Sequence, residues 1–280
     1  MSSINVFYTP KMSADSRSYS PSASKPALAV ASWLQKFAIN VVEPEPVDLI
    51  ELARAHDKAY IQNILSCRKN NGFGNKSKEV AETLCYTIGS MLSATLDAIK
   101  TNRFTCAPVS GFHHACWDHG GGFCTFNGLM VTGQSVLNQN LVDRVGILDC
   151  DMHYGNGTDD ILKHIGESRI IHYSAGLFNG TARQFLDQLP TLITELFKDC
   201  GVLLYQAGAD PHINDPLGGW MTTDELIERD TIVFETANSL GLPVSWCLAG
   251  GYQRDQSGGI APVLAIHDNT MQICLANQPR

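Results

Sequence analysis

The sequence predicts an open, mostly parallel α/β sheet flanked by helices, in a single domain over residues 1–280. Three observations support this fold class. Short apolar runs without polar alternation are typical of strands that are covered on both faces. Longer stretches with helical period separate these runs. No internal repeat or low-complexity linker divides the chain, because the loops expected at Pro44-Glu45-Pro46 and Asn70–Asn75 are too short to separate domains.

The predicted elements follow in chain order, beginning with a strand at Ile4–Tyr8. A helix is expected over Lys78–Lys100, because apolar residues recur there on one stripe: Val80, Leu84, Ile88, Met91, Leu92 and Ile99. Later strands are expected at Arg144–Cys150, Arg169–Tyr173, Val202–Gln206 and Val244–Leu248. Before the last of these, Thr222-x-x-Glu225 predicts the capping-box start of a helix that carries Leu226, Val233, Ala237 and Leu240.

Composition excludes several classes of function. Charged residues make up 17% of the chain against a usual value of about 25%, and 44% of residues are hydrophobic, which argues against disorder. The net charge of −8 opposes a phosphate backbone, so nucleic acid is not an expected partner. No run approaches the length of a membrane span, and Met1–Pro10 lacks the features of a signal peptide. We therefore expect a soluble, cytoplasmic protein.

Nine cysteines occur without any C-x-x-C pair. The apolar settings of Cys85, Cys150, Cys200 and Cys247 predict reduced, buried thiols. A nucleophilic or zinc-thiolate role would need partners at recognisable spacing, which these residues lack.

The Asp-x-Asp-x-His triplet that follows the apolar run Arg144–Leu148 predicts a metal site. Side chains alternate along an extended chain, so Asp149, Asp151 and His153 project to one side. Alone, such a triplet is more often a solvated acidic loop. Here it extends a buried strand and is followed by glycines, so a neutralising cation is the better interpretation.

One further ligand is expected from another strand end, where Asp210 follows Val202–Gln206 in an Ala-Gly-Ala-Asp segment. In open α/β sheets, ligands bind beyond the carboxyl ends of the strands. Two carboxylates and one imidazole suit Zn²⁺ with an open position for water, and they also tolerate Fe²⁺ or Co²⁺.

Three other segments carry candidate catalytic groups. His113 and His114 are adjacent and could act as general base and acid, although such a pair alone is more often structural. The run His119–Cys124 contains three glycines, so its backbone could approach a ligand closely. Phe123 in this run would then form an aromatic wall of the binding site. Tyr252 follows two glycines and could present its phenol to a developing oxyanion.

Five motifs in this order resemble the histone deacetylase superfamily, which has an arginase-like α/β fold and includes acetylpolyamine amidohydrolases and acetoin-utilisation proteins. The motifs are GFHHA at 111–115, GGFCTFNG at 121–128, ILDCDMHYGNGT at 147–158, AGADPHINDPLGG at 207–219 and AGGY at 249–252. A weaker match, Leu52-x-x-x-His56-x-x-x-Tyr60, resembles the N-terminal helix pair of the family.

The resemblance assigns a role to each matching residue. It implies that Asp151, His153 and Asp210 are the metal ligands, that Asp149 orients His113, and that Asn156 orients His114. Because an amide raises the basicity of an imidazole less than a carboxylate does, His114 is expected to be neutral and the better general base. Tyr252 would polarise the acyl carbonyl. Phe123 and Phe178 would line an acyl-lysine tunnel, with Leu217 at its rim and Gly122 accepting the amide N–H.

The resemblance also implies a reaction and a second ion. The reaction is hydrolysis of an N-acetyl amide by metal-activated water, with acetylated lysine or a small acetylated amine as the substrate. A structural potassium ion is implied near Asp149, Asp151 and His153, held by backbone oxygens and by the Ser174 hydroxyl.

Alternatives and departures from the family pattern stay open. An acetylpolyamine amidohydrolase, a two-manganese ureohydrolase and a catalytically silent acyl-binding module are the alternatives. Tyr154 stands where the family most often has a second histidine, and Val109-Ser110-Gly111-Phe112 replaces the usual Arg-Pro-Pro-Gly. Neither position is an expected metal ligand. The sequence leaves the physiological substrate and the oligomeric state open.

Overall fold

The computed structural model describes residues 3–279, in which seven strands form one sheet. The strand order is β2-β1-β3-β7-β6-β4-β5, and every neighbouring pair is parallel. The strands are β1 (Ile4–Phe7), β2 (Ile39–Val42), β3 (Phe104–Ala107), β4 (Val145–Asp149), β5 (Ile170–Ser174), β6 (Val202–Gln206) and β7 (Val244–Cys247). Because the strands are parallel, their carboxyl ends meet at one edge of the sheet.

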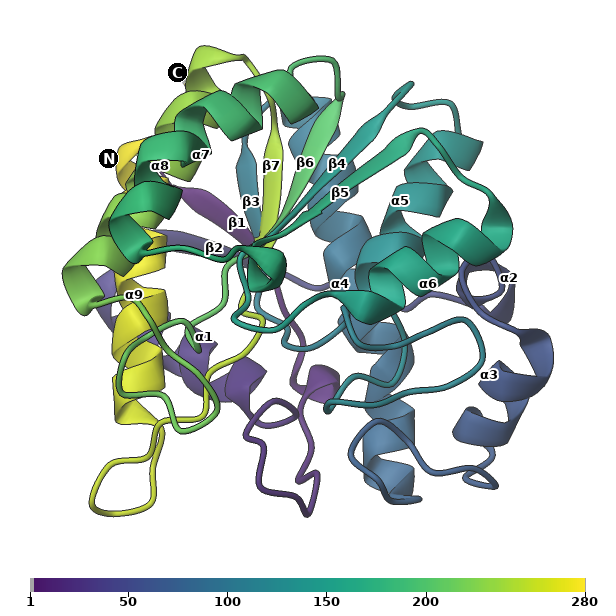
Figure 1. Ribbon diagram of the computed structural model, residues 1–280. Coiled ribbons are helices and arrows are strands. Elements are labelled where there is room, and N and C mark those ends of the chain that lie inside the picture. Colours follow the sequence, from purple (N-terminus) through teal and green to yellow (C-terminus); the bar gives the residue numbers. More distant parts are fainter. Residues whose placement is uncertain (1–2, 280) are drawn as a thin grey trace.

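Helices cover both faces of this sheet (Figure 1). One face carries α1 (Lys25–Lys36), α7 (Ala182–Phe197), α8 (Thr223–Ser239) and α9 (Ala261–Ala276). The other carries α2 (Leu49–Leu52), α3 (Lys58–Leu65), α4 (Lys78–Thr101), α5 (Gly128–Asn138) and α6 (Asn156–Ile165). Two short 3₁₀ helices lie at Pro10–Met12 and Ala175–Leu177.

The core consists of two apolar layers, one on each side of the sheet. In the layer against α1 and α9, the rings of Trp33 and Trp246 lie 5.6 Å apart between centroids. In the opposite layer, Met91 of α4 packs with Val131 of α5. Strands buried on both faces explain the runs of apolar residues without alternation.

The five predicted strands are confirmed, with ends that differ by at most one residue from those expected. The predicted helix at 78–100 is confirmed as α4. The capping box of Thr222 and Glu225 starts α8, although α8 ends at Ser239, so Leu240 caps the helix instead of lying within it. The sheet, expected to be mostly parallel, is parallel in every pairing of the described strands.

Two strands were not predicted. β2 has four residues at the edge of the sheet and is only partly buried, so its pattern does not resemble that of a covered strand. β3 is fully buried but reads Phe-Thr-Cys-Ala, and alanine is depleted in strands. The helix pair implied around His56 is present as α2 and α3.

The nine cysteines are all free thiols, and Cys150, Cys200 and Cys247 are buried as expected. The expectation of a buried thiol is wrong for Cys85, which is only partly buried on α4. Among the described residues, no helix combines the length and apolarity needed to cross a membrane.

Candidate metal centre and catalytic site

The predicted site residues come from the loops that follow three adjoining strands, β4, β6 and β7. Asp149 ends β4, so Asp151 and His153 lie just beyond the edge of the sheet. Asp210 follows the end of β6, and Tyr252 follows the end of β7. The topology therefore brings together groups that are up to about a hundred residues apart in sequence.

Asp151, His153 and Asp210 form a compact cluster of three ligand atoms, all within 4.8 Å of one another. Nδ1 of His153 lies 3.1 Å from Oδ1 of Asp151 and 3.1 Å from Oδ2 of Asp210. Nε2 of His153 lies 3.1 Å from the carbonyl oxygen of Leu217, which fixes the ring with Nδ1 toward the carboxylates. The structure thus brings together the three predicted ligands.

Backbone groups orient the two carboxylates. The N–H of Gly250 donates to Oδ2 of Asp151 at 2.8 Å, and the N–H of Met152 donates to Oδ1 of Asp210 at 3.2 Å. Both carboxylates are buried. Burial and the charge of Asp151 raise the pKa of Asp210 to about 7. The carboxylates of Asp151 and Asp210 are therefore held close together despite the repulsion between negative charges. A bound cation would relieve that repulsion.

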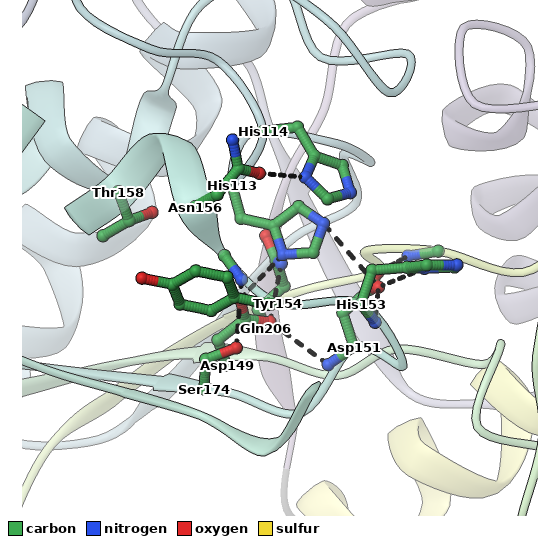
Figure 2. Close-up of polar contacts among 12 residues, drawn as sticks. His113, His114, Asp149, Asp151, His153, Tyr154, Asn156, Thr158, Ser174 and Gln206 are labelled. Atoms are coloured by element: carbon green, nitrogen blue, oxygen red, sulfur yellow. Dashed lines mark hydrogen bonds and ion pairs between the residues drawn. The ribbon is translucent and has the colours of Figure 1, made fainter. Parts of the chain in front are cut away.

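The adjacent histidines lie beside this cluster with their rings 4.0 Å apart between centroids (Figure 2). Nδ1 of His113 donates to Oδ2 of Asp149 at 2.7 Å, and Nδ1 of His114 donates to Oδ1 of Asn156 at 2.6 Å. Both orienting pairs implied by the family resemblance are thus present in the geometry.

The two histidines have opposite pKa shifts. Burial alone would lower the pKa of His113, but the carboxylates of Asp149 and Asp151 outweigh it and raise the pKa to about 9. Burial and the neighbouring His113 lower the pKa of His114 below its ordinary value. At neutral pH, His113 is therefore charged and His114 is neutral, with a lone pair on Nε2.

The carboxylate of Asp149 is fully buried and has further partners. Its Oδ1 accepts from Nε2 of Gln206 at 2.8 Å and from the N–H of Asp151 at 3.1 Å. Ser174 pairs in register with Asp149, and its hydroxyl accepts the N–H of Gly155 at 3.0 Å. A side chain that the sequence did not single out, His172, also lies against Asp149, with Nε2 3.9 Å from Oδ2.

Tyr252 is nearly buried, and its ring lies 5.7 Å from that of Phe123 between centroids. Burial and the carboxylates of Asp151 and Asp210 raise the pKa of the phenol well above its ordinary value, so the hydroxyl keeps its proton. The N–H of Tyr252 donates to Oδ2 of Asp215 at 2.8 Å. Tyr252 is thus fixed as a neutral hydrogen-bond donor.

The other residues predicted to line the tunnel differ in how well their positions agree with that role. Gly122 is exposed and lies in the turn between Gly121 and Cys124. Leu217 is 41% exposed, which fits a position at a rim. The ring of Phe178 packs on Trp220 at 5.8 Å and on Phe185 at 5.3 Å between centroids. The tunnel-lining role of Phe178 stays a prediction.

Sequence reasoning missed two buried charged residues next to the site. Nζ of Lys25 donates to the carbonyl oxygens of Ala249 at 2.7 Å and Gly250 at 3.1 Å. Burial lowers the pKa of Lys25 to about 8, against the opposing effect of Asp210 and the other nearby carboxylates. Asp215 accepts from the N–H groups of both Tyr252 and Leu217. Asp215 lies inside a family motif, whereas nothing in the local sequence distinguishes Lys25 from a surface lysine.

A surface pocket adjoins the glycine run on its outer side. Its charged lining residues are basic, and it is lined by Arg68, Lys69, Asn70, Asn71, Gly72, Gly74, Lys76, His119, Gly120 and Gly121. The loop that carries these cations docks on the glycine run, since the N–H of Phe123 donates to the carbonyl oxygen of Gly72 at 3.0 Å. Positive charge is therefore held beside the proposed mouth of the site.

Comparison with known proteins identifies related sequences. The histone deacetylase domain matches residues 21–175, a range that contains His113, Asp151 and His153. Histone deacetylase 2 of Arabidopsis thaliana is 26% identical over 257 residues, which cover 79% of this chain and 65% of the relative. Acetylpolyamine amidohydrolase 2 of Pseudomonas aeruginosa is 49% identical over 56 residues, which are 20% of this chain and 15% of the relative.

The fold is shared with a solved structure. The crystal structure of acetylpolyamine aminohydrolase from Burkholderia pseudomallei has a TM-score of 0.77 to this chain at 16% sequence identity. The match covers 97% of this chain and 98% of that protein. The predicted arginase/deacetylase-like fold is therefore confirmed.

Proposed function

The chain belongs to the histone deacetylase family, and from that premise we propose that it is a metal-dependent amidohydrolase. Its proposed reaction removes an acetyl or short acyl group from N-acyl-lysine or a related acylated amine. The observation that carries this proposal is the convergence of a three-ligand cluster with two histidines of opposite pKa shift. The general base, the charged imidazole and the ligand set that hydrolysis needs all lie at one edge of the sheet.

The residues present fit a divalent cation. Two aspartates and a histidine Nδ1 are a ligand set suited to Zn²⁺, and also to Fe²⁺ or Co²⁺. The backbone of Gly250 lies directly against the ligand carboxylates, because a Cβ added at Gly250 would lie 2.4 Å from Oδ2 of Asp210 and 2.7 Å from Oδ2 of Asp151. Any side chain at Gly250 would therefore displace these carboxylates. We propose Zn²⁺ as the first choice.

The chain's own residues supply the proton transfers. A bound cation would act as a Lewis acid toward the acyl carbonyl and toward a water molecule. His114 accepts a proton at Nε2, because Asn156 holds the hydrogen on Nδ1, and it returns the proton to the leaving amine. His113, held charged by Asp149, stabilises the negative charge that develops nearby. Tyr252 donates its hydroxyl hydrogen to the carbonyl oxygen as that oxygen gains charge.

The basic pocket beside the glycine run supports a lysine-type substrate over a polyamine. A polyamine carries several positive charges, and Arg68, Lys69 and Lys76 would repel them as they approach the site. A peptide with neutral or acidic residues around an acyl-lysine meets no such repulsion. Acyl-lysine in a peptide is therefore the proposed substrate class, and an acetylpolyamine is the alternative within the family.

Replacing Tyr252 by Phe tests the proposal. We expect zinc-loaded Tyr252→Phe to lose about a hundredfold or more in acetate release from an acetyl-lysine peptide, while peptide affinity is retained. Tyr19→Phe is the matched control, because the Tyr19 ring stacks on Tyr252 at 6.4 Å but is half-exposed. A catalytically silent acyl-binding module would release no acetate, either as the native protein or as the Tyr252→Phe variant. A ureohydrolase of the arginase type would bind two catalytic metal ions per chain, so the metal content is measured on the same samples.

A further inference from the structure

The proposed site opens to solvent between His114 and His153. The side chains of both histidines are partly exposed, whereas His113, Asp151 and Asp210 are buried. The rings of His114 and His153 lie 6.0 Å apart between centroids. A substrate that reaches the metal cluster from solvent therefore passes between these two rings, and it contacts the segments on either side of them.

The segments beside His153 form an apolar wall. The carbonyl oxygen of Leu217 accepts from Nε2 of His153 at 3.1 Å. A Cβ added at Gly176 would lie 2.3 Å from the carbonyl carbon of His153, so the residue before Leu177 is also in backbone contact with this histidine. Leu177 is 64% exposed and Leu217 is 41% exposed. We call four exposed or partly buried apolar residues of these segments the apolar rim: Leu177, Phe178, Leu217 and Trp220.

The two loops that carry the apolar rim are joined and almost free of charge. The ring of Phe178 stacks on that of Trp220 at 5.8 Å between centroids, which connects the loop after β5 to the loop after β6. Asp215 is the only aspartate, glutamate, lysine or arginine in residues 175–180 and 211–220. It is buried, and its carboxylate accepts from backbone N–H groups. A preorganised apolar surface of this kind binds a partner at a low cost in ordering.

A hollow of about 360 Å³ lies beside the apolar rim, and Leu177 and Phe178 form part of its lining. The one carboxylate in that lining belongs to Asp159. One oxygen of Asp159 accepts from the hydroxyl of Tyr154, and the other accepts from Nδ1 of His172. The hollow thus offers space and apolar contact to a bulky side chain, and its carboxylate is already hydrogen-bonded within the protein.

The wall beside His114 is positively charged instead. A Cβ added at Gly122 would lie 2.3 Å from Cδ2 of His114, so the glycine run is in contact with this ring. The loop at 68–76 packs against the same run, because a Cβ added at Gly72 would lie 2.0 Å from the carbonyl oxygen of Cys124. We call 68–76 the basic loop, since it contains three basic residues and no acidic residue. The two sides of the opening therefore differ in charge and in polarity.

We propose that the site selects an acyl-lysine peptide with apolar side chains on one flank of the lysine and acidic side chains on the other. The apolar flank buries surface against the apolar rim, and the acidic flank is attracted by the basic loop. A charged flank at the rim would lose water without gaining a partner, which disfavours it there. This inference rests on the proposed function for its choice of substrate, and it adds the flanking sequence.

Peptide affinity tests the flank preference without turnover. Four fluorescent peptides carry acetyl-lysine between two-residue flanks: leucines before and aspartates after, the reverse order, leucines on both sides, and aspartates on both sides. Both residues of a flank are changed together, because alternate side chains of an extended peptide point to opposite sides. Kd is measured by fluorescence anisotropy on zinc-loaded Tyr252→Phe. We expect at least one mixed peptide to bind about fivefold or more tightly than either uniform peptide. Any other ranking, or no binding, overturns the inference.

Acetate release from the same peptides separates this inference from the proposed reaction. It is measured on the zinc-loaded native protein. If no peptide releases acetate but a mixed peptide still binds most tightly, the proposed reaction fails and the flank preference stands. If all four peptides release acetate and bind equally well, the reaction stands and the flank preference fails.

Leu177→Ser with Leu217→Ser tests the apolar rim directly. Both side chains are exposed, so we expect the double variant to fold, and the preferred mixed peptide should lose about fivefold or more in affinity. The matched control is Leu34→Ser with Leu196→Ser. These leucines are 61% and 40% exposed, and they lie near the ends of α1 and α7, at the opposite edge of the sheet. Affinity that is unchanged in the first pair, or reduced equally in both pairs, would contradict the role of the rim.

Discussion

At the scale of single residues, the two adjacent histidines of the proposed site differ in the group that accepts the Nδ1 hydrogen. His113 faces the carboxylate of Asp149, and His114 faces the amide of Asn156. A carboxylate favours the imidazolium form, whereas an amide does so only weakly. This difference acts together with burial, with the charge of Asp151 near His113 and with the effect of His113 on His114 to separate the pKa values of the two rings, and the proposed roles follow from that separation.

Asn156→Asp tests this assignment through the pH profile. A carboxylate at this position would raise the pKa of His114, so a smaller fraction of His114 would be neutral at any given pH. We expect the acid limb of kcat/KM to move to higher pH in the variant, because the base must lose its proton before it can act. The measurement is the pH dependence of acetate release with zinc content checked at each pH. A limb that stays in place would show that another group controls it.

Lys25 is a fully buried lysine that supports the loop carrying Tyr252. Its ammonium group donates to the carbonyl oxygens of Ala249 and Gly250, three and two residues before Tyr252. Lys25→Met would leave both carbonyls without this partner. We expect the free energy of unfolding to fall by roughly 2 kcal/mol. Because the loop that carries Tyr252 would loosen, kcat is also expected to fall by about ten- to a hundredfold.

The control for Lys25 is Val30→Ala, a buried position on the same helix. This substitution should lower stability by a comparable amount without touching the loop. Acetate release and urea unfolding are measured for both variants. If Lys25→Met loses stability but keeps the native kcat, the ammonium group supports the fold alone.

At the scale of elements, a buried arginine on α8 connects the segments that follow β4 and β6, which carry the proposed metal ligands. Nη1 of Arg229 donates to the carbonyl oxygens of Gly208 at 2.7 Å and Cys150 at 3.3 Å. Nε of Arg229 donates to Asp230 at 2.9 Å. Cys150 precedes Asp151, and Gly208 lies two residues before Asp210. The helix therefore fixes the separation of two proposed metal ligands, Asp151 and Asp210, that follow different strands.

Arg229→Met should weaken both the fold and the metal site. It leaves Asp230 buried without its cation, so we expect the free energy of unfolding to drop by about 3–5 kcal/mol. Zinc affinity, measured by competition with a chelator, should fall by roughly tenfold or more. Adding Asp230→Asn removes the unpaired charge and should restore part of the stability but not the zinc affinity.

The control for Arg229 is Phe234→Leu, a buried substitution on the same helix whose ring packs on Phe104, Tyr205 and Trp246 and makes no hydrogen bond to Cys150 or Gly208. This variant should lose stability and keep its zinc affinity. Equal zinc affinity in Arg229→Met and the native protein would show that α8 supports the sheet without setting the ligand geometry.

The elements also show what the sequence could predict. Asp149, Asp151 and His153 were predictable because they recur at a spacing of two residues from the end of a buried strand, although the chain bends at 151–153 after β4 ends. Asp210 and Tyr252 were predictable because each follows a strand end, and parallel topology brings strand ends together. The strand β2 was not predictable, since its four residues are only partly buried. Edge strands lack the continuous apolar run that identifies a central one.

Lys25 and His172 were not predictable for a different reason. The carbonyl oxygen that Lys25 holds at 2.7 Å belongs to a residue 224 positions away, and the local sequence of Lys25 is that of an ordinary helix start. His172 sits in a strand where alternate residues point to one face, and only the packed structure shows that this face meets Asp149. The structural role of a buried polar residue depends on hydrogen-bond partners that are distant in sequence, so the local sequence does not reveal it.

At the scale of the whole molecule, the charge is unevenly distributed. The chain has a net charge of −8, yet the pocket beside the glycine run contains Arg68, Lys69 and Lys76. The loop is held in place, because the side chain of Asn71 accepts the N–H of Phe73 at 2.9 Å and donates to Asn75 at 2.9 Å. A fixed positive region next to the site, on an acidic protein, should select among substrates by their charge.

Reversing this local charge should change the substrate preference. Among the described residues, Arg68 and Lys76 are exposed and belong to no ion pair, so Arg68→Glu with Lys76→Glu should leave stability nearly unchanged. We expect kcat/KM for an acetylpolyamine to rise by roughly tenfold at low salt, and kcat/KM for an acetyl-lysine peptide with acidic neighbours to fall. Both changes should shrink at high salt, since added ions screen exposed charges.

The matched control reverses two lysines that end α6 and α7, where the chain turns back to begin β5 and β6. Lys163→Glu with Lys198→Glu changes the net charge by the same amount but at the opposite edge of the sheet from the site. If both double variants alter substrate preference equally, the net charge of the molecule controls the approach of the substrate. If only the first pair does, the loop beside the glycine run acts as a local charge filter, and the preference for peptide over polyamine follows from its position.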